Sequence, residues 1–282
     1  MTLPTGEKSI SAEQIRDEFG PTESSNKVAL GEYRVEKNFG ELSEIPLDEG
    51  IPQGNDPISF DNFHGKKLNV IVDYYTSKYA DYTRSSEGEA MNIRDRFTSG
   101  TDVATVSING LKTYDKEDSS ETKVIVHVNR KLGGQKSGNA AVCALRTGSG
   151  WEADTEMIID VGNEGAIYGA GGNGGRGGDT DAAGDDGQTG TSGLGISLAN
   201  VEVNVASSGK IRAGFGGGGG GGSGRQRDKG DDRRAGGGGG GGGQGFPAGT
   251  GGVGGEPAEA ENGTNGSLNE HGEGGERAQN AS

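Results

Sequence analysis

Short apolar or alternating stretches recur through the middle of this 282-residue chain. Each is bounded by Gly, Asn, Asp or Ser, which are typical turn residues, so each predicts a β-strand. The five stretches are Leu68–Val72, Val103–Ile108, Thr122–Val128, Ala140–Leu145 and Glu156–Val161. Together they predict a small antiparallel β-sandwich over residues 67–160, with Trp151 as a candidate core residue.

The pattern before this region is different, because residues 1–66 carry isolated apolar positions separated by Gly and Pro. Ser11 and Gln14 have the spacing of a capping box, which predicts one short helix from about Ala12 to Phe19. The remainder is typical of an extended segment lying on a partner surface, so we expect a docking arm. Its candidate docking residues are Leu3, Ile10, Ile15, Phe19, Ile58, Phe60 and Phe63.

Glycine replaces the apolar pattern in the last part of the chain, where 44 of the 59 glycines lie at or after Gly162. Two runs, Gly216–Gly222 and Gly236–Gly243, flank the charged segment Arg225–Arg234. Glycine loses much backbone entropy on ordering, which favours a flexible linker. Glycine also lets strands in a threefold extended conformation approach closely enough to hydrogen-bond laterally, which favours a packed polyglycine bundle.

An internal repeat leads into the glycine tracts. The motif Ile159–Val161, Gly165, Ile167 recurs 44 residues later as Val203–Val205, Gly209, Ile211. Repeats of this kind stack on one another, because neither copy buries its apolar face alone. We therefore expect an ordered, mainly β chain. Its last parts are a glycine-rich repeated β region with polyglycine tracts over residues 161–255 and a polar acidic tail over 256–282.

Composition and charge narrow the function. A formal net charge of −15 disfavours nucleic acid as a partner, because phosphate binding depends on Lys and Arg. No apolar run follows Met1, and nowhere do about twenty apolar residues come together, so we expect cytosolic synthesis without a signal peptide and no membrane insertion. No Ser-His-Asp set, paired acids or phosphate-binding loop stands out, and we expect no enzymatic activity and no cofactor.

Metal binding is also disfavoured. Oxygen ligands for calcium are present at Asp179, Asp181, Asp185 and Asp186, but their order lacks the spacing of an EF-hand or of a calcium-binding nonapeptide. The three histidines lie far apart in the sequence, without the spacing of a zinc site.

Two stretches resemble proteins of bacteriophage tails and fibres. The opening Met-Thr-Leu-Pro-Thr-Gly6, with the later Ile58–Lys66, is similar to the start of phage minor tail proteins. That resemblance implies that residues 1–66 attach the chain to other virion proteins. The second stretch, Gly165–Gly178 with Gly209–Phe215 and the long glycine runs, resembles the glycine-rich domain of phage adhesins. This resemblance implies polyglycine helices that present loops to a bacterial surface.

We therefore expect a virion tail or fibre protein, made in the host cytoplasm, that binds a surface glycan or an outer-membrane protein of a bacterium. A homotrimer is expected, since fibres commonly satisfy open faces by cyclic association. One alternative is a purely structural virion component, such as a neck fibre, a baseplate component or a capsid decoration, whose glycine domain acts in assembly. Another is a cellular glycine-rich structural or ice-binding protein, which would leave the docking arm unexplained.

The candidate receptor contacts lie between or after the glycine runs. In a bundle, such segments are displaced to its end, where charged side chains can pair with anionic groups or sugar hydroxyls. The candidates are Arg225, Arg227, Asp228, Lys229, Asp231, Asp232, Arg233, Arg234 and Phe246. The alternative is a solvated charged loop that only keeps two glycine runs apart.

Overall fold

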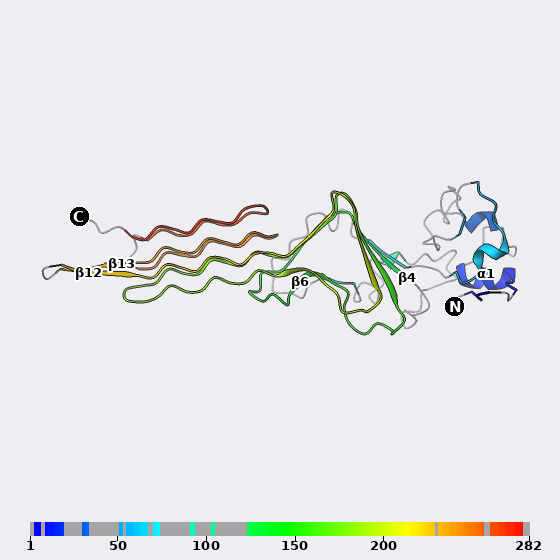
Figure 1. Cartoon of the computed structure of the whole chain (residues 1–282), viewed down its shortest axis with the longest axis horizontal. Helices are drawn as coiled ribbons and strands as arrows, with labels where there is room; N and C mark the ends of the chain where they lie inside the picture. Colours follow the sequence, from blue (N-terminus) through cyan, green and yellow to red (C-terminus); the bar gives the residue numbers. More distant parts are fainter. Residues whose placement is uncertain are drawn as a thin grey trace.

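The computed structural model describes most of the second half of the chain and shorter segments of the first. The described residues are 3–6, 9–19, 30–33, 51–52, 55–66, 70–73, 91–93, 103–104, 123–228, 231–256 and 260–278. The molecule is elongated, with helix α1 at one end, strands in the middle and long glycine-rich tracts at the other end (Figure 1). Among the described residues, no helix has the length and apolar character needed to cross a membrane.

The N-terminal segment contains helix α1 (Ala12–Phe19) and two short 3-10 helices, η1 (Leu30–Tyr33) and η3 (Phe60–Phe63). The predicted capping box is confirmed, because the Ser11 N–H donates to Gln14 Oε1 (2.8 Å) and the Gln14 N–H donates to Ser11 Oγ (3.1 Å). The described residues differ from the extended arm expected. They bury apolar side chains of their own, among them Leu3, Ile15, Tyr33, Ile51 and Phe63.

The middle of the molecule is a three-sided prism of parallel strands. One side contains β4 (Lys123–Val128), β7 (Glu156–Val161) and β10 (Val201–Val205), extended by β1 (Val70–Asp73) and β3 (Val103–Ala104). The second contains β5 (Lys131–Gly133), β8 (Ala166–Tyr168) and β11 (Lys210–Arg212). The third contains β2 (Met91–Asn92), β6 (Cys143–Arg146) and β9 (Ser192–Gly195). From β4 on, the chain visits the three sides in turn, and each circuit adds strands beside those of the previous one (Figure 1).

The mainly β class is confirmed, but the predicted antiparallel β-sandwich over residues 67–160 is corrected. The described pairs β1–β4, β2–β6 and β4–β7 are all parallel, and only β1–β3 is antiparallel in that range. Strands that follow one another around a prism return to each side in the same direction. A two-residue alternation shows which side chains face the core and carries no information on the direction of the neighbouring strand.

The interior of the prism is filled by rows of apolar side chains from successive circuits. Leu132, Ile167 and Ile211 occupy one row, and the first two have no exposed surface. The 44-residue repeat seen in the sequence is a stacking relation, since β10 pairs with β7 and β11 with β8 at that offset. Polar residues follow the same relation, as the Asn204 side-chain amide donates to Asp160 Oδ1 (3.0 Å). The sheet that contains β7 and β10 therefore joins strands from both sides of residue 161, where the glycine-rich region was expected to begin.

The glycine-rich part forms a bundle of extended tracts beside the prism, which we number 1 to 7. They are 169–178, 182–191, 213–223, 236–246, 247–256, 260–267 and 270–278. Their lateral hydrogen bonds recur every third residue: the N–H groups of Gly171, Gly174 and Gly177 in tract 1 donate to three carbonyls of tract 5 at 2.8–2.9 Å. A three-residue period is the repeat of the polyglycine or polyproline II conformation. The composition allows either a flexible linker or a packed polyglycine bundle, and the structure shows the packed bundle.

Tract 4 is the centre of the bundle. Its backbone is hydrogen-bonded to tracts 1, 3, 5, 6 and 7, and Gly236–Gly243 are all buried. A Cβ atom at Gly240 would lie 2.0 Å from the Gly218 carbonyl oxygen, and a Cβ at any other glycine of this run would clash with backbone in the same way. This close approach of five neighbours is the physical reason for an uninterrupted run of glycine.

The segment expected as an acidic tail contributes two of these tracts. Residues 260–267 and 270–278 pack against tract 4 and against each other, with the Thr264 N–H donating to the Glu273 carbonyl (2.8 Å). Glycine is required only where these tracts face their neighbours, at positions such as Gly263, Gly266, Gly272 and Gly275. The three-residue spacing within each pair is the sequence signal that identifies them.

Candidate functional site

The bundle gathers several chain connections at its distal end, the end farthest from the prism (Figure 1). Tracts 1 and 2 are joined there by a turn that begins at Asp179. Tracts 3 and 4 are joined by a hairpin of strands β12 (Gly224–Asp228) and β13 (Asp231–Ala235). Tract 5 ends at Glu256 and tract 6 begins at Ala260. Segments far apart in the sequence therefore form one terminal surface.

The β12–β13 hairpin contains most of the predicted receptor contacts and extends beyond the tracts (Figure 1). Its antiparallel register pairs Arg225 with Arg234, Arg227 with Asp232, and Asp228 with Asp231. Lys229 lies outside the described residues. Five cations and three carboxylates give the segment Arg225–Arg234 a formal charge of +2, in a chain whose net charge is −15. The hairpin thus differs in charge from the acidic molecule that supports it.

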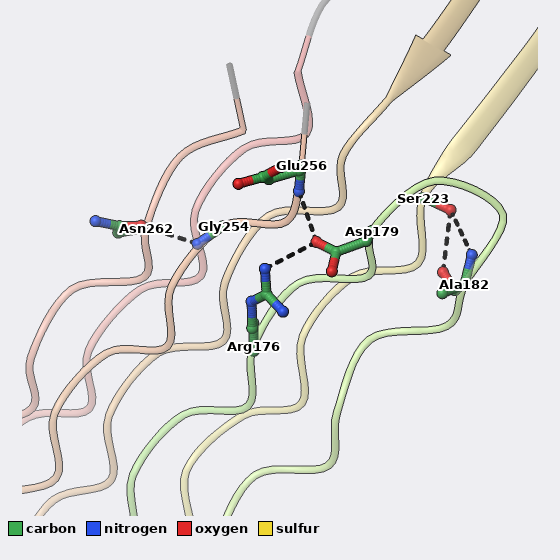
Figure 2. A network of polar contacts seen from close by, with 7 residues as sticks. All are labelled: Arg176, Asp179, Ala182, Ser223, Gly254, Glu256 and Asn262. Carbon is green, nitrogen blue, oxygen red and sulfur yellow. Dashed lines mark hydrogen bonds and ion pairs between the residues drawn. The ribbon is translucent and has the colours of Figure 1, made fainter. Parts of the chain in front are cut away.

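A polar network holds the turn between tracts 1 and 2 against tract 5 (Figure 2). Asp179 Oδ1 accepts a hydrogen bond from the Glu256 N–H (2.8 Å) and one from Arg176 Nη2 (3.0 Å). Arg176 precedes the turn on tract 1, and both charged side chains are about half exposed. One carboxylate thereby fixes the end of tract 5 beside the turn.

Two further contacts fix the neighbouring tracts at this end (Figure 2). Ser223 Oγ, at the start of the hairpin, accepts from the Ala182 N–H and donates to the Ala182 carbonyl, both at 3.0 Å. The Gly254 N–H donates to Asn262 Oδ1 (2.8 Å), which joins tract 5 to tract 6. Side chains thus continue the pattern of lateral bonds where the regular backbone pairing ends.

The aspartates considered for calcium do not fit a metal site. Asp179 is engaged by Arg176 and Glu256, Asp181 lies in the turn, and Asp185 and Asp186 lie on tract 2. Within the described part of the chain, which includes all four, no three His, Cys, Asp or Glu side chains are grouped so that they could hold an ion.

Phe246 lies at the opposite end of the bundle from the hairpin. Its ring packs edge-on against Tyr168 at the end of β8, with centroids 6.4 Å apart, and its carbonyl accepts from the Gly134 N–H (2.9 Å). The structure therefore places Phe246 beside the prism, apart from the charged candidates. A different aromatic pair is exposed on the flank, where Phe215 meets His271 edge-on at 5.1 Å.

The candidate docking residues fall into two groups. Leu3, Ile15 and Phe63 are buried within this chain, whereas Ile10 and Ile58 are half-buried and Phe60 is 40% exposed. Phe19 is the last residue of α1. Of the residues whose side chains are described, Phe60 presents the largest apolar side chain to the surroundings of this segment.

Asp179→Ala is expected to loosen the distal surface and to lower its local stability by about 0.5–1.5 kcal/mol, because the exposed Glu256 N–H exchanges a charged acceptor for water. Hydrogen exchange of the Glu256 amide measures this opening directly. Asp179→Asn is the matched control, since its side-chain oxygen keeps the acceptor and removes only the charge that pairs with Arg176. Equal exchange rates in the wild type and Asp179→Ala would contradict the assigned role.

Comparison with protein families identifies the class of protein. Residues 91–282, more than half of the chain, match the model of a family of phage tail fibre adhesins. The family is described as phage tail fibre adhesin Gp38, and this chain belongs to it. It is therefore a mainly β adhesin of the phage tail fibre with a role in host binding.

Among solved structures, the chain is similar to the crystal structure of the gp37-gp38 adhesin tip complex of the bacteriophage S16 long tail fibre. The two share 19% sequence identity, with 87% of this chain and 80% of the other covered and a TM-score of 0.31. A search of curated proteins found no match.

Proposed function

We propose that this adhesin contacts the host surface with the distal end of its glycine bundle. The observation that supports the proposal is the convergence of the turn at Asp179, the β12–β13 hairpin and the end of tract 5 on one surface at the tip of an elongated molecule. The tracts behind it are hydrogen-bonded laterally at every third residue. The sequence of a short tip connection can change without altering that framework.

Binding through such a tip depends on preorganisation. The hairpin is held between tracts 3 and 4, and tract 4 is bonded to five neighbours, so little backbone entropy remains to be lost on contact with a receptor. The Arg and Asp side chains of Arg225–Arg234 suit the phosphates, carboxylates and hydroxyls of a bacterial surface glycan, or the charged loops of an outer-membrane protein. Several weak contacts at one tip combine through their high effective concentration.

Residues 1–66 are proposed to attach the adhesin to another virion protein. The solved structure that resembles this chain is, by its title, a complex between gp37 and gp38 of a long tail fibre. Phe60 is the candidate contact, since it remains exposed while Phe63 beside it is buried.

We further propose that the chain acts by binding alone, without enzymatic activity. The homotrimer stays a prediction. One reason for it was that a single chain would leave open faces with unpaired backbone groups. That reason is weakened, because a single chain pairs most backbone groups of the central tract. Light scattering of the purified protein measures the oligomeric state.

Replacing Arg225–Arg234 with a Gly-Ser turn of equal length is expected to reduce phage adsorption at least about tenfold, since the charged contacts are removed while the tracts remain. Adsorption of the mutant phage to host cells measures the effect. The matched control replaces Leu268 and Asn269, the turn between tracts 6 and 7 at the other end of the bundle. Unchanged adsorption with both replacements would contradict binding through the hairpin.

A further inference from the structure

The β12–β13 hairpin has two faces that differ in charge. Residues alternate between the faces along each strand, and directly opposite residues share a face. We call one of them the cationic face, and the register gives it Arg225, Arg227, Asp232 and Arg234. The other face has Gly224, Gln226, Asp228, Asp231, Arg233 and Ala235. Three arginines and one aspartate give the cationic face a formal charge of +2, whereas one arginine and two aspartates give the other face −1.

Tract 7 covers the second face at the base of the hairpin. A Cβ atom at Gly224 would lie 3.3 Å from Arg277 Nη1 and 4.0 Å from the Ala235 Cβ. Ala235 is buried, whereas Arg234, its neighbour on the cationic face, is exposed. At its base the hairpin therefore presents the cationic face to the surroundings of the tip.

The first pair on the cationic face brings two like charges together, because Arg225 lies directly opposite Arg234. Like charges directly opposite each other in a two-stranded ribbon are destabilising. A second like-charge pair, Asp228 with Asp231, flanks the turn, where aspartate is favoured by turn chemistry. The arginine pair has no such local reason. A bound anion would offset its repulsion, so the pair indicates an anion site.

The size and charge of this pair suit one phosphate group. The Cβ atoms of directly opposite residues lie about 4.5–5.5 Å apart, so two long side chains can reach the same group. Each guanidinium has a planar fork of N–H donors that fits a phosphate or a carboxylate. A phosphate monoester carries a charge of about −1.5 to −2 at pH 7, whereas a carboxylate carries a single charge. The phosphate thus balances the formal charge of +2 on the cationic face.

We propose that Arg225 and Arg234, with Arg227 on the same face, bind a phosphate monoester of a bacterial surface glycan. This inference rests on the proposed contact of the tip with the host, and it names the group that is bound there. Ser223, two residues before Arg225, is hydrogen-bonded to Ala182 of tract 2 (Figure 2). The arginine pair thereby lies close to a fixed point of the bundle, which lowers the entropy cost of binding.

The test titrates the full chain with glucose 6-phosphate, glucuronate and glucose, measured by calorimetry at low ionic strength, where anion binding is least screened. Saturable binding of glucose 6-phosphate is expected, at least about tenfold tighter than that of glucuronate, with none for glucose. Inorganic phosphate is expected to compete with glucose 6-phosphate, because the arginines bind the phosphate group itself.

Arg225→Gln is expected to weaken the binding of glucose 6-phosphate at least about tenfold. The matched control is Gln226→Glu, which lowers the formal charge by the same amount at the next residue, on the other face. Its effect is expected to stay below about twofold, since it acts only through the screened field. Hydrogen exchange of the β12 and β13 amides is expected to be no faster in Arg225→Gln than in the wild type, because a like-charge pair has been removed.

Absence of saturable binding of glucose 6-phosphate to the wild type would overturn the inference. Equal affinity for glucuronate, or equal weakening by Arg225→Gln and Gln226→Glu, would do the same.

Adsorption of mutant phage separates this inference from the proposed function. The proposed function fails if adsorption is unchanged when the whole hairpin is replaced. The phosphate site alone fails if that replacement reduces adsorption but Arg225→Gln does not. Reduced adsorption of Arg225→Gln, in a protein whose wild type binds no glucose 6-phosphate, would also overturn the site, in favour of an acidic surface of an outer-membrane protein.

Discussion

Gly240→Ala is expected to disrupt the glycine bundle and to lower the free energy of unfolding by more than about 4 kcal/mol. Losses of this size are exceptional and are typical of severe defects in a protein core. The added methyl would lie 2.0 Å from the Gly218 carbonyl oxygen, which is backbone and cannot rotate away. Tracts 3 and 4 must separate, and the bond from the Gly240 N–H to the Gly175 carbonyl (2.9 Å) is strained with them. Each buried polar group left without a partner costs about 1–3 kcal/mol.

Differential scanning calorimetry measures the loss, and limited proteolysis of residues 169–278 locates it. Gly222→Ala is the matched control, because nothing lies within 4 Å of a Cβ at that position. Its effect is expected to lie between zero and a stabilisation of about 1 kcal/mol, since alanine has less backbone entropy to lose. A bundle that tolerated alanine equally at both positions would disprove the close packing of tract 4.

Ile167→Ala is expected to destabilise the prism by about 2–5 kcal/mol, the cost of removing a large buried side chain and leaving a cavity. Ile167 has no exposed surface and lies between Leu132 and Ile211 in one interior row. Collapse of neighbours into the space is restricted, because the strands on both sides are hydrogen-bonded to β8. Calorimetric unfolding of the full chain measures the change.

The control for this substitution is Ile196→Ala, at a side chain that is 50% exposed. It removes the same atoms and is expected to cost less than about 1 kcal/mol, because little apolar surface leaves the interior. Similar losses for the two variants would contradict the assignment of Ile167 to the core.

Local chemistry was readable from the sequence. The capping box at Ser11 and Gln14 predicts α1 at its observed bounds, because the signal and the structure both lie within one helical turn. Four of the five predicted strands, Leu68–Val72, Thr122–Val128, Ala140–Leu145 and Glu156–Val161, overlap observed strands over most or all of the observed length. In the stretch Val103–Ile108, the structure describes a strand only at Val103–Ala104. The 44-residue repeat likewise predicted which residues stack, since similar side chains occupy equivalent positions in successive circuits of the prism.

The candidate site could be predicted only in part from the sequence. The hairpin at Arg225–Arg234 follows from two flanking glycine runs, but its neighbours at the tip do not follow from any local pattern. Asp179 and Glu256 are 77 residues apart and meet because tracts 1 and 5 lie side by side. The sequence places Phe246 among the candidate receptor contacts together with the charged residues. Tract 4 runs from the hairpin toward the prism, however, so Phe246 lies at the end of the bundle opposite the hairpin.

The mainly β character, the short helix, the repeat and the high glycine content follow from the amino-acid sequence alone, because they depend on residue type and spacing along the chain. The parallel direction of the strands, the central place of tract 4 and the packing of the C-terminal segment into the bundle become known only from the three-dimensional structure. These features depend on which backbones lie beside one another. A backbone N–H carries no side-chain signature of its partner, so glycine tracts of similar composition become distinct only once their neighbours are in place.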